Sequence, residues 1–209
     1  MAKKKPTRKE LLRSPDEFLS ISSRAWAYLS NRQKELSYIG IAVAVLIVVY
    51  LGVDSYLGRV DRKGQNAYNK ASTALAEVQE KSGMTEPGEL EKAKELFQKV
   101  IDDYGLSDAA TVSLPHLGYI HYIQGSYDSA GRMYEEFAEE VKGEATYGNL
   151  ADLARASCLE EKGDLKDAID ILRPMADQPE ASFRELAMWN LARVYRMDGR
   201  EKEAKTALQ

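Results

Sequence analysis

The sequence predicts an all-α protein in which a single N-terminal transmembrane helix is followed by an α-solenoid of helix pairs. The first observation is an uncharged run of eighteen residues, Leu36 to Val53, in a chain that is 30% charged. The second is a Gly-x4-Ala pattern that occurs three times after this run. The third is the helical spacing of alanine and other apolar residues in the segment between them, from Gln65 to Glu80.

Residues 1–35 are expected to form a basic cytoplasmic tail with an amphipathic helix. They contain nine Lys or Arg and four Asp or Glu. A helix is predicted to start at Ser14-Pro15-Asp16-Glu17, where Ser suits the N-cap, Pro the first turn and Glu the capping box. Its apolar stripe is Phe18, Ile21, Ala25, Tyr28 and Leu29. We interpret this helix as a lead-in that lies on the membrane surface; a docking helix for a partner protein is the alternative.

Residues 36–57 are predicted to be a transmembrane anchor that contacts the lipid bilayer through Leu36 to Val53. Eighteen helical residues span about 27 Å, close to the apolar thickness of a bilayer. Eleven of the eighteen are Leu, Ile or Val. A buried core helix and a cleaved signal peptide are the alternatives. A soluble helix of this length would show a polar face, and a signal peptide would have a shorter leader and a small-x-small cleavage site.

The distribution of charge sets the expected orientation. The short basic tail favours the cytoplasmic side, whereas the long domain after the anchor can translocate whatever its charge. We therefore expect a single-pass protein of a bacterial inner membrane, with a cytoplasmic N-terminus and a periplasmic C-terminal domain.

The domain after the anchor is acidic. Residues 54–209 carry twenty Lys or Arg and twenty-nine Asp or Glu, a net charge of −9. This balance argues against nucleic acid as a partner, because nucleic-acid binding depends on neutralising phosphates. The single cysteine, Cys158, cannot form an intramolecular disulfide and is expected to be a small buried helix residue.

Three stretches after the anchor share one pattern of small residues. Each has Gly followed five residues later by Ala, and the stretches are Gly125 to Ala130, Gly163 to Ala168 and Gly199 to Ala204. The alanines are 38 and then 36 residues apart. A small residue stands seven residues before each Gly, a larger one four residues before it, and a bulky apolar one four residues after each Ala. These residues are, in the same order, Gly118, Ala156 and Ala192; His121, Leu159 and Tyr195; and Tyr134, Leu172 and Leu208.

This pattern resembles the tetratricopeptide repeat, in which a small residue of helix A allows helix B to pack closely. The resemblance implies that residues 58–209 form a tetratricopeptide-like repeat domain of about four helix pairs. The first pair would be degenerate, with helices at Gln65–Glu80 and around Leu90 to Val100 on either side of a turn at residues 82–88. The last pair stops at Gln209, either because the chain ends there or because the sequence is a fragment.

The order of the parts resembles the YfgM-like family of membrane-anchored repeat proteins. The features that carry the resemblance are the anchor, an Ala67-Tyr68-x-x-Ala71 helix, a Leu96-Phe97 helix, a Tyr104-Gly105 junction and the Gly-x4-Ala units. Members of this family are ancillary subunits of the SecYEG translocon. The resemblance therefore implies an accessory or chaperone-like interaction module, with the translocon and a periplasmic chaperone as partners. An envelope scaffold that organises a different complex, in cell division or outer-membrane assembly, is the alternative.

A concave groove lined by the A helices is the expected binding surface, because stacked helix pairs usually bind partners there. Trp189, Arg193 and Arg196 follow one stripe of one helix, and an aromatic residue with Arg is typical of interface hot spots. Packing of Trp189 in the core is the alternative. The full set that the repeat register places in this groove is Tyr119, Tyr122, Leu153, Glu160, Trp189, Arg193 and Arg196.

No enzymatic activity, cofactor or metal site is expected. His116 and His121 are five residues apart, too far around a helix to share a metal ion as an i, i+4 pair could. The sequence has no Gly-rich phosphate loop, G-x-S-x-G or Cys-x-x-Cys. The carboxylate pairs are interpreted as a solvated acidic face and are Glu135, Glu136, Glu139 and Glu140.

The predicted topology can be tested with alkaline phosphatase fusions, because this enzyme is active only after export. A fusion after Gly64 should be active and a fusion after Met1 inactive. The reverse pattern would contradict the orientation.

Overall fold

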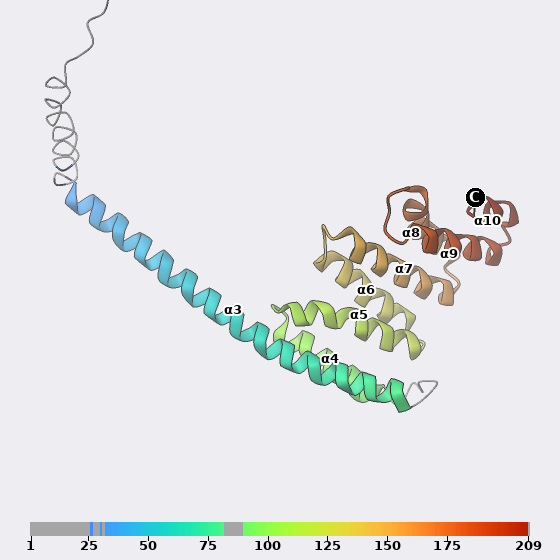
Figure 1. The fold of residues 1–209 in the computed structure, drawn as a ribbon, viewed down its shortest axis with the longest axis horizontal. Helices are drawn as coiled ribbons and strands as arrows, with labels where there is room; N and C mark the ends of the chain where they lie inside the picture. Colours follow the sequence, from blue (N-terminus) through green and yellow to red (C-terminus); the bar gives the residue numbers. More distant parts are fainter. Residues whose placement is uncertain (1–25, 27–29, 31, 82–89, 209) are drawn as a thin grey trace, which may run out of the picture. The chain divides into compact units, whose positions relative to one another are not determined.

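The computed structural model describes residues 26, 30, 32–81 and 90–208, and Figure 1 shows the chain as a ribbon. All regular structure within these residues is helical, which confirms the all-α class. The predicted tail helix after Ser14 and the predicted turn at residues 82–88 lie outside the described residues. The helices are α3 (Gln33–Lys81), α4 (Glu91–Tyr104), α5 (Asp108–Ile123), α6 (Tyr127–Glu140), α7 (Ala145–Lys162), α8 (Leu165–Asp177), α9 (Arg184–Met197) and α10 (Glu201–Thr206).

Helix α3 is long and apolar enough to cross a membrane. None of its most apolar eighteen-residue window is buried. A core helix of a soluble protein would bury such a surface against other elements. The core-helix alternative therefore does not fit this segment.

The chain divides into two compact units, residues 1–55 and residues 56–209, and α3 begins in the first and ends in the second. In the second unit every helix from α4 to α9 packs against the helix that follows it in the chain. Figure 1 shows this succession of neighbouring helices from α5 to α9. Consecutive packing of this kind is the arrangement of an α-solenoid.

The contacts between the helices of each pair fall at the small residues. Ala130, Ala168 and Ala204 are at most 3% exposed, and the three small residues of the preceding helices are buried as well. At Gly118 of α5, an added Cβ would lie 3.0 Å from the ring of Tyr134 on α6. The absence of a side chain at Gly118 thus makes room for Tyr134, and the predicted packing register is confirmed.

Each repeated glycine sits at the turn between two helices. Gly163 caps the C-terminus of α7 with φ of 83°, and Gly125 and Gly199 have φ of 73° and 74°. This left-handed conformation suits glycine because other residues place a Cβ against the backbone. At the end of α7 the turn is closed by the N–H of Asp164, which donates to the carbonyl of Leu159 at 2.9 Å.

Two core clusters hold the ends of the second unit. The first joins α3, α4 and α5 and contains Ala71, Ala74, Leu75, Leu90, Ala93, Phe97, Leu117 and Ile120. The second joins α7 to α10 and contains Leu153, Ala156, Ala168, Ile169, Leu172, Met175, Ala176, Ala187, Leu191, Val194, Tyr195 and Ala204. A smaller cluster of Leu114, Phe137 and Ala151 lies between them on α5, α6 and α7.

One predicted packing residue is not in the core. Leu208 was expected to pack as Tyr134 and Leu172 do, but its side chain is 58% exposed. Helix α10 ends at Thr206, so Leu208 lies beyond the helix face that carries the buried Ala204. The prediction for Leu208 is therefore wrong.

Replacing Ala168 by Trp should destabilise the second unit by about 1 to 3 kcal/mol or more, because a fully buried alanine leaves no space for an indole. Urea unfolding followed by circular dichroism measures this change. Glu139→Trp is the matched control, since Glu139 is exposed on α6 and only forms a surface ion pair with Lys142. Equal losses of stability in both variants would contradict the packing register.

Candidate protein-binding groove

The A helices expose a row of apolar side chains at one repeat position. Val112 on α5, Leu150 on α7 and Leu186 on α9 are 40%, 47% and 45% exposed. They are separated by 38 and 36 residues (150 − 112 and 186 − 150), the same intervals as the buried alanines. Each stands six residues before the small residue of its helix. The repeat therefore places one exposed apolar residue at the same point of three consecutive A helices.

A cavity of about 400 Å³ includes two residues of this row. We call it the apolar groove. Ser157, Asn190 and the hydroxyl of Tyr134 are its only polar side-chain groups, and a mostly apolar lining with few polar groups is typical of binding sites. Its lining residues are Pro115, Tyr134, Phe137, Leu150, Ala151, Leu153, Ala154, Ser157, Leu186 and Asn190.

Tyr134 forms a wall of the apolar groove because Gly118 admits its ring against α5. Burial raises the pKa of the Tyr134 hydroxyl well above its ordinary value. The hydroxyl is therefore protonated at neutral pH and can donate or accept a hydrogen bond. The small residue that allows the helix pair to close thus also positions a polar group in the groove.

Arg193 of α9 connects the polar edge of the groove to α7. Its guanidinium forms an ion pair with Glu160 and donates to Oδ1 of Asn190 at 3.1 Å. It also lies 5.4 Å from the ring centre of Trp189. Burial raises the pKa of Glu160, and the charge of Arg193 acts in the opposite direction. Because the ion pair with Glu160 fixes the guanidinium of Arg193, the hydrogen bond from Arg193 holds the side chain of Asn190 in place.

Tyr122 is used to join helices within the repeat domain. Its hydroxyl donates to Oε1 of Glu161 on α7 at 3.2 Å, and its ring packs edge-on against Tyr127 with centres 5.5 Å apart. Burial, together with the neighbouring charge of Glu161, raises the pKa of Tyr122 to about 12. The other predicted groove tyrosine, Tyr119, is half-buried against the core cluster of α3, α4 and α5.

The structure separates the remaining predicted groove residues into buried and exposed ones. Leu153 is only 5% exposed and belongs to the core cluster of α7 to α10, so it forms the floor of the groove and not a free contact. Glu160 is 7% exposed because it faces Arg193. Trp189 is 58% exposed, so the alternative that it packs in the core is wrong. Arg196 is exposed and lines a separate hollow.

Sequence reasoning missed the residues that form the apolar groove itself. Leu150 and Leu186 were not selected, nor were Pro115, Ala154 and Asn190. The available signal was the apolar residue six positions before each small residue. The predicted groove residues instead stand three positions before, one position after or four positions after the small residue of their own helix. Two of them, Leu153 and Glu160, are buried because the packing of the helix pairs directs these positions inward.

The remaining polar candidates have internal roles. His116 stacks on Phe97 with ring centres 5.0 Å apart, and its Nε2 is 2.9 Å from the hydroxyl of Tyr68. Burial lowers the pKa of both His116 and His121. Cys158 is buried as predicted, and burial raises its pKa to about 11, so it is a thiol at neutral pH. Residues 32–81 and 90–208 contain no group of three side chains able to hold a metal ion.

Two family models match the second unit. A model described as "Tetratricopeptide repeat" matches residues 56–107, and one described as "Tetratricopeptide repeat-like domain" matches residues 121–209. The chain is a tetratricopeptide repeat protein. Domains of this kind generally bind protein partners and are typically interaction modules, not enzymes. A search of curated proteins finds no match to the chain.

The burial of Glu160 in this tetratricopeptide repeat domain predicts a pH dependence of stability. Because the folded pKa of Glu160 is raised above 4.5, the folded state binds a proton more tightly than the unfolded state between these two pKa values. Stability should therefore rise as the pH falls through this window.

The measurement is the free energy of unfolding of the wild type minus that of Glu160→Gln, from urea titrations at several pH values between neutral and 4.5. The difference should increase as the pH falls. A difference that decreases would mean that the charge of Arg193 outweighs burial.

Proposed function

We propose that this protein is a membrane-anchored interaction module that acts as an accessory, chaperone-like subunit beside the Sec translocon, with its repeat domain in the periplasm. The observation that carries the proposal is the apolar groove on the A helices of a tetratricopeptide repeat domain. The translocon is proposed because the anchor, the degenerate first pair and the Gly-x4-Ala units follow the order of the YfgM-like family.

The chemistry of the groove fits an apolar segment of a protein partner. Leu150 and Leu186 offer apolar surface that remains in contact with water, and its burial by a partner would contribute about 25 cal/mol per Å². Ser157, Asn190 and Tyr134 offer hydrogen bonds to the polar groups of the same segment. Trp189 is exposed on α9, only three residues after Leu186 and one before Asn190, and could extend the contact. A partner that covers these residues would bury both apolar and aromatic surface, as hot spots do.

The proposed anchor explains how modest affinity would suffice. A domain tethered to the bilayer meets other proteins of the same membrane at a high effective concentration. This applies to a translocon and equally to the alternative, an envelope scaffold for a division or outer-membrane assembly complex. The identity of the captured partner distinguishes the two.

In-cell photo-crosslinking tests the proposal. A photoreactive residue at position 189 should crosslink to translocon subunits or to a periplasmic chaperone, whereas one at position 106 should not. Leu106 is the matched control because it is 73% exposed in the connection between α4 and α5, away from the groove. Crosslinks only to division or outer-membrane assembly proteins would support the scaffold function and contradict the translocon.

Replacing both Leu150 and Leu186 by Gln should reduce these crosslinks by about 10- to 100-fold, which corresponds to a loss of about 1.4 to 2.8 kcal/mol of binding free energy. The melting temperature should change little because both side chains are about half exposed. The control is Leu106→Gln with Leu208→Gln, which changes two equally apolar but more exposed positions. Undiminished crosslinking in the groove variant would remove the groove from the binding surface.

A further inference from the structure

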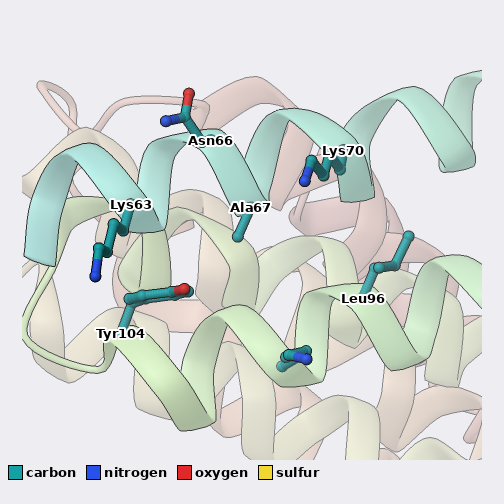
Figure 2. Close-up of a pocket in the computed structure, with 7 residues that line it drawn as sticks. Lys63, Asn66, Ala67, Lys70, Leu96 and Tyr104 are labelled. Carbon is teal, nitrogen blue, oxygen red and sulfur yellow. The ribbon is translucent and has the colours of Figure 1, made fainter.

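Helices α3 and α4 enclose a second cavity of about 460 Å³ that is lined by three lysines. Lys63 and Lys70 come from α3 and Lys99 from α4. Figure 2 shows Lys63 and Ala67 directed from α3 toward α4, with Tyr104 and Leu96 facing them from α4. We call this space the basic cavity. It shares no residue with the apolar groove.

The three lysines form no direct ion pair with a carboxylate of the described residues. No residue that lines the basic cavity is acidic. Within residues 32–81 and 90–208, none of the three lysines takes part in an ion pair, whereas Lys94 on the same α4 pairs with Glu91 at 3.0 Å. This occurs in a domain whose net charge is −9 (20 − 29). Three positive charges without a direct carboxylate partner line one cavity, and an anion bound there would be attracted by all three.

An adjoining hollow differs from the basic cavity in containing an acidic residue. It shares Lys70 and Leu96 with the basic cavity and adds Lys92, but it also contains Glu77. The acid lies toward the end of α3, whereas the acid-free part is formed by residues 63–70. The purely basic part is therefore the part of α3 that follows the predicted anchor most closely in the chain.

The basic cavity also has apolar surface beside its lysines and Asn66. Ala67 and Leu96 provide aliphatic surface, and Tyr104 adds a ring and a hydroxyl. An added Cβ at Gly64 would lie 2.5 Å from Oγ of Ser107 and 3.2 Å from Cβ of Tyr104. The absence of a side chain at Gly64 thus allows the backbone of α3 to pack closely against the end of α4. A ligand with a negative group and apolar substituents suits such a site better than a bare ion.

The chain itself limits the distance from the basic cavity to the predicted anchor. Lys63 follows Val53 by only ten residues of the chain, and both residues belong to α3. A lysine side chain can extend along apolar surface and place its ammonium group at the level of lipid headgroups. Basic clusters next to a membrane span attract anionic lipids in this way.

We propose that the basic cavity binds the phosphate of an anionic glycerophospholipid from the leaflet in which the anchor ends. Lys63, Lys70 and Lys99 contact the phosphate oxygens, and Ala67, Leu96 and Tyr104 contact the glycerol and the first methylene groups. The proposal rests on the membrane anchor of the proposed function. A short acidic peptide is the competing occupant, but the cavity has the volume of a small-molecule site and lies on the helix that carries the anchor.

Native mass spectrometry of the full chain in a neutral detergent tests the proposal. Phosphatidylglycerol should bind more tightly than phosphatidylcholine with the same acyl chains. The variant Lys63→Gln, Lys70→Gln, Lys99→Gln should bind phosphatidylglycerol more weakly, by about fivefold for each lysine that contacts the phosphate. The matched control is Lys166→Gln, Lys202→Gln, Lys205→Gln, which removes the same charge from exposed lysines of α8 and α10. This control should bind like the wild type.

Four further measurements separate the possible outcomes. Equal loss of lipid in both triple variants, or equal binding of the two lipids, would overturn the proposal. Full displacement of the lipid by millimolar glycerol phosphate would assign the site to a free phosphate ester. Displacement by a hexaglutamate peptide at lower concentration would assign the site to an acidic protein segment. Either result would overturn the lipid assignment. Carbonate extraction of membranes reports on the anchor alone, so release of the wild type would refute the anchor without deciding the lipid titration. Far-UV circular dichroism shows whether each variant remains folded.

Discussion

The close contact of two helices at small residues is the constraint on which the rest of the repeat domain depends. Gly118 admits the ring of Tyr134, and Ala130, Ala168 and Ala204 pack without exposed surface at the corresponding contacts. Since an α-helix has 3.6 residues per turn, fixing one residue at the contact fixes the direction of every other residue in that helix. The positions of the core, of the turns and of the exposed face all follow from this contact.

The apolar groove is one consequence of that geometry. With the small residue turned inward, the residue six positions earlier emerges on the side of the A helix that neighbouring helices do not cover. In α7 and α9 this residue is a leucine, and in α5 it is a valine. The polar edge follows in the same way, because Arg193 comes one residue after the small residue of α9 and meets Glu160 of α7. Successive A helices are thus joined by polar pairs at one end of the row and present apolar side chains at the other.

The parts of the fold that depend on a local pattern were predictable, and those that depend on the packing of two repeats were not. The period, the glycine turns and the buried alanines were all visible in the sequence, because each needs only one residue type at one spacing. The burial of Leu153 and Glu160 was not, since it depends on how far α7 and α9 turn toward each other. The exposure of Leu208 depends on the length of α10, for which the repeat pattern has no signal. The lysines of the basic cavity come from two helices that are far apart in the sequence, so only the folded pair brings them together.

The two cavities differ in chemistry because they have different origins in the fold. The apolar groove lies where repeats stack, and stacking selects apolar residues at equivalent positions. The basic cavity lies within the degenerate first pair, where α3 also continues the predicted anchor and is not restricted to the repeat pattern.

Since the two cavities share no lining residue, an anion in one does not compete directly with a protein segment in the other. Helix α5 packs against both α3 and α4 and thus connects the two sites. Any effect of one ligand on the other would be reciprocal, because a coupling free energy belongs to both ligands. Under the two proposals, the lipid would occupy the first helix pair and the protein partner the later pairs.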